Sequence, residues 1–285
     1  MDYVSQFGAH VDSEPANMAW DRLASRWWSD RPIHRFSHRQ KIQNILPLIK
    51  DYDHVMDVTR GASVDGILGV VAAGQGKRVT IVSPSNNHIA ALRRFAGENG
   101  IDPSVIEFVH TGNGPLESLD VKRADCVTAL HILEHATHPR SFLSFLRDRT
   151  SNRCILAVPT CANPTAWVRM GGDTDPYVFT AGSLQAAARG IRRTATAKIR
   201  GRAAVTEFVN EYGTTTVHRW FFPSALFAEL EWSGFHIEQM RPDSLAIPWL
   251  NRSIQLSQIL QDHLPDVLTS GLGFGTHFVL RPVPA

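Results

Sequence analysis

Short, mostly apolar segments alternate with helix-like segments through the middle of this 285-residue chain. Strands that are apolar throughout are usually buried on both faces, and alternation with helices is typical of a parallel sheet covered on each side. The pattern therefore predicts an α/β chain with a doubly wound, mostly parallel sheet. The five predicted strands of this series are His54–Val58, Val79–Val82, Val105–Val109, Cys126–Leu130 and Cys154–Val158.

The segments around and after these strands have helical spacing or strand-like composition. Residues 15–50 carry tryptophan and aliphatic side chains at helical intervals. Glycines end several of the helical patterns, as they commonly do just after a helix. The further predicted helices are Val64–Ala73, Asn86–Asn99, Arg140–Arg149 and Ser224–Ser233, and two closing strands are predicted at Phe235–Met240 and His277–Arg281.

Composition narrows the class of protein. The chain is 43% hydrophobic and 20% charged, with a net charge of +2, which indicates a globular protein and gives no sign of a nucleic-acid partner. No apolar run approaches the roughly 18 residues of a transmembrane helix, and the first thirty residues hold five acidic residues and no signal-like apolar core. The three cysteines form no C-x-x-C pair, so we expect reduced thiols and a cytoplasmic location.

Two motifs at predicted strand ends resemble those of a known family. The residues Val55-Met56-Asp57-Val58 with Gly61, and the run Ala129–His135, resemble the first and fourth motifs of class I S-adenosylmethionine-dependent methyltransferases. The segments Trp20–Trp28 and Glu211–Phe235 are similar to the ubiquinone-biosynthesis O-methyltransferase branch. This resemblance implies a Rossmann-like seven-stranded fold with a helical lid.

The resemblance also divides the chain into four parts. Residues 1–50 would form an N-terminal helical segment, 51–160 the cofactor-binding Rossmann-like core, 161–222 a helical lid or substrate lobe, and 223–285 the closing helix and strands of the core.

The resemblance assigns S-adenosylmethionine binding to Asp57, Gly61, Ser83, Asn113 and Leu130, although several of these positions depart from the family pattern. Gly61 is the only glycine left in a loop that usually holds three. Ser83 stands where the family has an acidic residue for the ribose hydroxyls, and one hydroxyl cannot replace a bidentate carboxylate. Asn113 replaces an aspartate that meets the adenine, whereas Asp57 is retained.

A histidine-rich run supplies the strongest chemical pattern. His131, Glu134, His135 and His138 fall at i, i+3, i+4 and i+7, which on a helix would share one face. Two imidazoles and a carboxylate make His131, Glu134 and His135 candidate ligands for one divalent transition metal, zinc or iron better than magnesium. The alternative is that no metal binds and these residues line the substrate cleft.

His218 and His135 are the candidate catalytic residues. An imidazole has a pKa near neutrality and could take a proton from an acceptor hydroxyl. A further feature is the stretch 176–206, which holds six Lys or Arg residues between positions 189 and 202. It either recruits an anionic partner or is a solvated helical face, and we expect it outside the sheet core. Its cations are Arg189, Arg192, Arg193, Lys198, Arg200 and Arg202.

Two functions follow from these observations. The first is S-adenosylmethionine-dependent O-methylation of a small-molecule acceptor, with assistance from a metal and with an acceptor that is anionic. The second is a methyltransferase-fold protein that no longer methylates. It would be either a metal-dependent enzyme that uses the His131 cluster or a non-catalytic partner of an active homologue.

Overall fold

The computed structural model describes most residues of the chain. These are 16–28, 32–61, 65–112, 119–161, 163–172, 174–176, 178–201, 203–209, 215–242, 249, 256, 259–260, 263–264 and 275–283.

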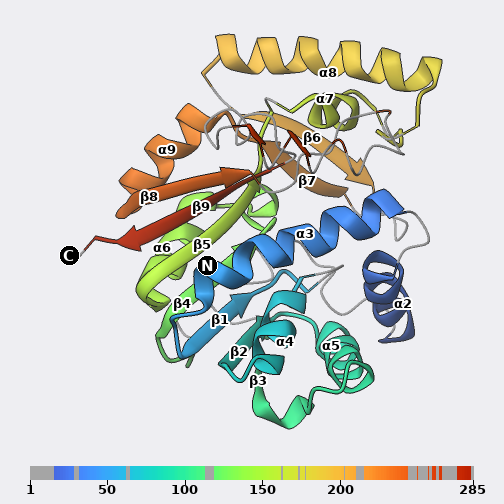
Figure 1. Cartoon of the computed structure of the whole chain (residues 1–285). Coiled ribbons are helices and arrows are strands. Elements are labelled where there is room, and N and C mark those ends of the chain that lie inside the picture. The colour runs from blue at the N-terminus through green and yellow to red at the C-terminus, as the bar shows by residue number, and fades with distance from the viewer. Residues whose placement is uncertain are drawn as a thin grey trace.

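A seven-stranded sheet with the order β3-β2-β1-β4-β5-β9-β8 organises the molecule (Figure 1). The first five strands of this order are parallel, and β9 pairs antiparallel with both neighbours. The chain leaves β1 toward β2 on one side and returns to β4 on the other, so the strand order reverses between β1 and β4. The strands are β1 (His54–Val58), β2 (Arg78–Ser83), β3 (Ile106–His110), β4 (Ala124–Leu130), β5 (Thr150–Pro159), β8 (Phe235–Pro242) and β9 (Gly275–Pro282).

Helices cover both faces of this sheet. Alternate residues of a strand point to opposite faces, so Val55 packs in the cluster with α2 to α5, and Met56 packs in the cluster with α6 and α9. The predicted doubly wound α/β fold is therefore confirmed. The helices are α2 (Ala16–Trp27), α3 (Pro32–Ile49), α4 (Ile67–Gly74), α5 (Asn86–Glu98), α6 (Pro139–Arg149) and α9 (Pro223–Trp232).

A second lobe stands above the sheet in Figure 1 and consists of α7 (Pro164–Gly171), α8 (Ala181–Ile199) and a hairpin. The hairpin pairs β6 (Ala204–Val209) with β7 (Thr215–Trp220) antiparallel. The part of the chain expected as a helical lid or substrate lobe, 161–222, therefore contains a β-hairpin beside its two helices. The physical reason is visible in the composition of both strands, which are rich in β-branched and aromatic residues that suit a sheet.

Two glycines let α7 and α8 approach closely. A Cβ atom added at Gly190 would lie 1.8 Å from the carbonyl oxygen of Trp167, and one added at Gly171 would lie 1.6 Å from that of Ala186. Contacts below 3.0 Å require the backbone to move. The second lobe therefore contains a tightly packed helix pair.

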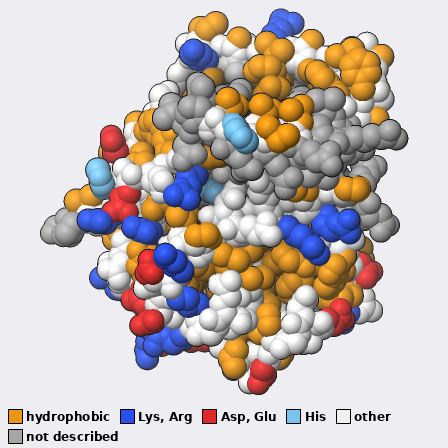
Figure 2. All heavy atoms as spheres, in the orientation of Figure 1, with side chains coloured by type: hydrophobic (Ala, Val, Ile, Leu, Met, Phe, Trp, Pro, Cys, Tyr) orange, Lys and Arg blue, Asp and Glu red, His pale blue; other side chains and the backbone are white. Residues whose placement is uncertain are grey.

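The basic stretch lies outside the sheet, mainly on α8, as expected. Figure 2 shows hydrophobic and Lys or Arg side chains over α8 at the top of this face. Arg189 and Arg193 donate hydrogen bonds to the carbonyl oxygens of Gly171 and Met170, at the end of α7. These two cations therefore have a structural role, because the last carbonyls of a helix lack helical partners. Arg202 lies outside the described residues.

The described helices include none that is long and apolar enough to cross a membrane.

Candidate active site

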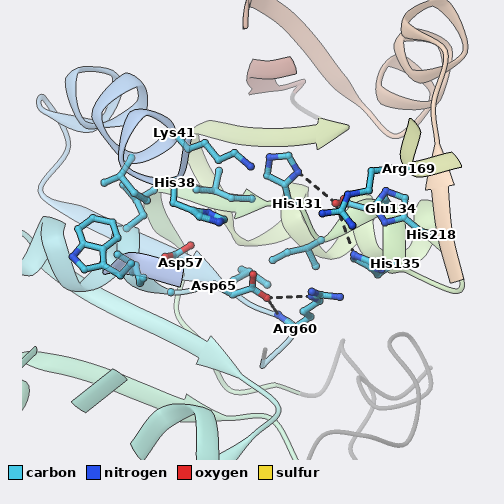
Figure 3. A pocket seen from close by; sticks show the side chains of 18 of the residues that line it. His38, Lys41, Asp57, Arg60, Asp65, His131, Glu134, His135, Arg169 and His218 are labelled. Atoms are coloured by element: carbon cyan, nitrogen blue, oxygen red, sulfur yellow. Dashed lines mark hydrogen bonds and ion pairs between the residues drawn. The ribbon is translucent and has the colours of Figure 1, made fainter. Parts of the chain in front are cut away.

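A cavity of about 360 Å³ opens where β1 and β4 end, at the reversal of the strand order. Open α/β sheets bind ligands at this place, beyond the carboxyl ends of the strands. The walls come from α3, the start of α4, the turn after β4, α7 and β7 (Figure 3). The cavity therefore lies between the sheet and the second lobe.

Asp57 lines this cavity and fastens α4 to the sheet. One oxygen of its carboxyl group accepts a hydrogen bond from the Gly69 backbone N–H at 2.9 Å, and the other accepts one from the Thr128 hydroxyl at 2.8 Å. Complete burial raises the pKa of Asp57 to about 7. Gly66, the N-cap of α4, has a φ of 82° and offers no side chain, so Asp57 supplies the missing acceptor at this helix start.

The loop after β1 contributes an ion pair to the same wall. Arg60 lies 3.4 Å from the carboxylate of Asp65, and both side chains line the cavity. Burial raises the pKa of Asp65 to about 6, against the opposing effect of Arg60. Gly61 has a φ of 81° and packs against the chain after β2. A Cβ there would lie 3.0 Å from the side chain of Ser85.

The predicted cofactor residues separate into two groups. Asp57 and Leu130 line the cavity, whereas Gly61 and Ser83 do not. Ser83 is fully buried, and its hydroxyl lies 3.3 Å from the ring of His88 and accepts the Ser85 N–H. A ribose contact by Ser83 stays a prediction that this geometry does not favour. Asn113 lies outside the described residues.

The histidine-rich run does not form one helical face. His131 has a φ of 57°, Leu133–His135 is a single 3-10 turn, and Pro139 already begins α6. A left-handed residue at one end and a proline at the other leave no room for a continuous helix. His138 becomes the N-cap of α6 instead.

This turn also does not gather metal ligands. Glu134 Oε1 lies 3.5 Å from His131 Nδ1 and 4.0 Å from His135 Nε2, while His135 Nδ1 lies 3.1 Å from the carbonyl oxygen of Val217. Within the described part of the chain, no group of three or more His, Cys, Asp or Glu side chains is arranged to hold a metal ion. The structure therefore does not support the predicted metal on His131, Glu134 and His135.

His218 and His135, the two predicted catalytic residues, do meet at the cavity. Their ring centroids are 4.8 Å apart, and the His218 ring packs at 4.2 Å on Trp220. Burial lowers the pKa of His218 to about 4 and that of His135 well below its usual value. Both imidazoles are therefore neutral at pH 7 and can exchange hydrogen bonds with a ligand.

Three further polar side chains line the cavity and were not expected from the sequence. His38 and Lys41 come from α3, and Arg169 comes from α7. None of them belongs to a motif or follows a predicted strand. Only the packing of α3 and α7 over the strand ends brings these side chains to the site.

No family model and no curated protein matches this chain. Similar solved structures include magnesium protoporphyrin IX methyltransferase from Synechocystis, with 15% identity, coverage of 93% of this chain and 94% of that one, and a TM-score of 0.53. The CcbJ methyltransferase from Streptomyces caelestis has 12% identity, coverage of 93% and 98%, and a TM-score of 0.53. The glycopeptide N-methyltransferase MtfA, solved with S-adenosylmethionine, has 15% identity, coverage of 86% and 93%, and a TM-score of 0.50.

These likenesses define the class of fold. The chain has the Rossmann-like, seven-stranded fold of S-adenosylmethionine-dependent methyltransferases. At 12–15% identity they establish the fold alone, and the ubiquinone-type branch stays a prediction.

Proposed function

We propose that this protein is an S-adenosylmethionine-dependent methyltransferase that methylates an oxygen of a small-molecule acceptor in the cytoplasm. The observation that carries the proposal is the cavity at the ends of β1 and β4, with Asp57 fixing the start of α4 beside it. The similar fold of methyltransferases supports it.

The residues at the start of α4 fit the amino-acid end of S-adenosylmethionine. Gly66, Ile67 and Leu68 line the cavity, and the N-terminal N–H groups of a helix favour a carboxylate. Arg60 adds a cation on the same wall. In this proposal the start of α4 and Arg60 hold the carboxylate.

Bound S-adenosylmethionine would supply an electrophilic methyl group, and the protein's part is to position the acceptor and manage its proton. His218 is neutral at pH 7, so it can take up the proton that the acceptor hydroxyl releases when it is methylated. Glu134 acts to raise the pKa of His218, so it stabilises a proton that moves onto this ring. No step is assigned to a metal, because the side chains of the turn after β4 do not converge on one point.

We expect His218→Phe to lower the rate of methyl transfer by about 100-fold or more, the usual contribution of a proton-transfer group. Phenylalanine keeps the ring packing on Trp220 but removes both nitrogens. The measurement is formation of S-adenosylhomocysteine with hydroxylated small molecules as acceptors. The matched control is His236→Phe, which replaces an exposed histidine on β8 and should leave the rate unchanged. Equal rates for the two variants would remove His218 from the mechanism.

The second candidate is a methyltransferase-fold protein that does not methylate. The packing at the end of β2 favours it, because Ser83 is buried and Gly61 packs on Pro84 and Ser85. Failure to bind S-adenosylmethionine would distinguish this candidate from the first.

A further inference from the structure

Arg169 is a cavity-lining cation that is not paired with an anion of the described chain. It extends from α7 toward His218 and Glu134 (Figure 3). Arg60, on another wall, is paired with Asp65, whereas Arg169 forms no ion pair or hydrogen bond with the residues that the structure describes. A partly buried guanidinium loses part of its hydration, and here no group among those residues compensates for that loss. A bound carboxylate would compensate for it by forming charged hydrogen bonds.

Glu134 lines the same cavity and offers an acceptor of hydrogen bonds. Its side chain is only 1% exposed, and Oε1 faces His131. The second oxygen, Oε2, accepts no hydrogen bond from any described residue. A buried carboxylate oxygen without a donor is costly, and a ligand hydroxyl would satisfy it.

Arg169 and Glu134 both lie near the ring of His218. Arg169 lowers the pKa of His218 and Glu134 raises it, so both charges lie near that ring, yet among the described residues they form no ion pair with each other. A ligand that carries both an anion and a hydrogen-bond donor would contact each of them.

The hydrogen-bond donor of such a ligand could be a hydroxyl or an ammonium group, and the charge of the cavity favours the hydroxyl. Three Lys or Arg side chains line it, Lys41, Arg60 and Arg169. Of the carboxyl groups beside them, Asp65 pairs with Arg60, and Asp57 has a pKa raised to about 7, so it is about half neutral at pH 7. This balance disfavours an additional positive group.

We propose that the acceptor is a small hydroxy acid, with its carboxylate held by Arg169 and its hydroxyl donating to Glu134 Oε2 beside His218. That the acid accepts a methyl group rests on the proposed function, whereas its binding at this site does not. Arg169 is then the residue that selects acids over neutral analogues.

The test compares acids with their amides by calorimetric titration, with and without S-adenosylhomocysteine. The probes are 4-hydroxybenzoate against 4-hydroxybenzamide and mandelate against mandelamide. We expect at least one acid to bind about 10- to 100-fold more tightly than its amide, as charge-assisted hydrogen bonds allow. Arg169→Met should abolish the preference, Arg169→Lys should retain part of it, and Glu134→Gln should weaken the acid while keeping the preference.

Arg192→Met is the matched control, since it removes an exposed cation of α8 in the same lobe. Thermal unfolding checks that each variant is folded. Equal binding of acid and amide, no binding of either acid, or a preference that survives Arg169→Met would overturn the proposal. Acid binding without any binding of S-adenosylhomocysteine would instead contradict the methyltransferase function and leave this site standing.

Discussion

Asp57→Asn is expected to stabilise the protein increasingly as the pH rises from 4 to 8, by on the order of 4 kcal/mol at the upper end. The pKa of Asp57 is raised from 3.8 to about 7 in the folded protein by burial. A pKa difference of one between the folded and unfolded states is worth about 1.4 kcal/mol. Because the folded state holds the proton more tightly, it loses stability as the pH rises from about 4 to about 7. An amide cannot ionise, so the variant escapes this loss.

The contacts of Asp57 explain why an amide fits there. Its oxygen can accept the Gly69 N–H, and its amino group can donate to the Thr128 hydroxyl. That hydroxyl lies 3.4 Å from the carbonyl oxygen of Met56 and can turn its proton there. The hydrogen bonds that Asp57 makes to Gly69 and Thr128 are therefore kept in the variant.

Urea unfolding at pH 5, 6, 7 and 8 measures this effect. Asp65, with a pKa raised to about 6, contributes in the same direction and should leave a smaller pH dependence in the variant. Asp102→Asn is the control, because hydrogen bonds from Ser104 lower the pKa of this exposed group and its loss gives no gain at high pH. A variant that is equally destabilised at every pH would show that the charge of Asp57 is required.

Gly190→Ala is expected to cost about 3 kcal/mol or to detach α8 from α7. Its Cβ would lie 1.8 Å from the backbone oxygen of Trp167, so the helices must separate, and overpacking of this kind typically costs about 1–3 kcal/mol. Gly182→Ala, on the same helix, is the control. The atom nearest to its added Cβ would be 3.6 Å away, and alanine favours a helix.

Thermal unfolding and limited proteolysis compare these two glycine variants. We expect the Gly190 variant to unfold earlier and to be cleaved within the second lobe, while the Gly182 variant stays at or above the parent. Equal stabilities would contradict the close packing of α7 and α8.

The sheet was predictable because its strands carry their signal locally. The bounds of β1 match the prediction, and those of β2 to β4 differ by one or two residues, because a strand buried on both faces is an apolar run between turns. The hairpin β6–β7 was missed, since its short strands follow a stretch dominated by arginines. Asp57 and Leu130 line the cavity because the motifs that resemble those of methyltransferases fall at strand ends, which meet at one edge of the sheet.

The rest of the site depends on tertiary packing. The spacing of His131, Glu134 and His135 suits a helix, but the left-handed backbone at His131 and the start of α6 at Pro139 override it. Arg169 contacts the cavity only because α7 folds back over the strand ends. Nothing near Arg169 in the sequence indicates that position.

Calorimetric titration of the purified protein with S-adenosylhomocysteine and S-adenosylmethionine tests the proposed methyltransferase function most directly. We expect one binding site per chain for each compound. Arg60→Met should lower the affinity about 10-fold, because it removes a charged partner of the ligand carboxylate, and Arg192→Met should leave the affinity unchanged. If the protein is folded and neither compound gives a heat of binding at millimolar concentration, the proposed function is contradicted and the non-methylating alternative is left.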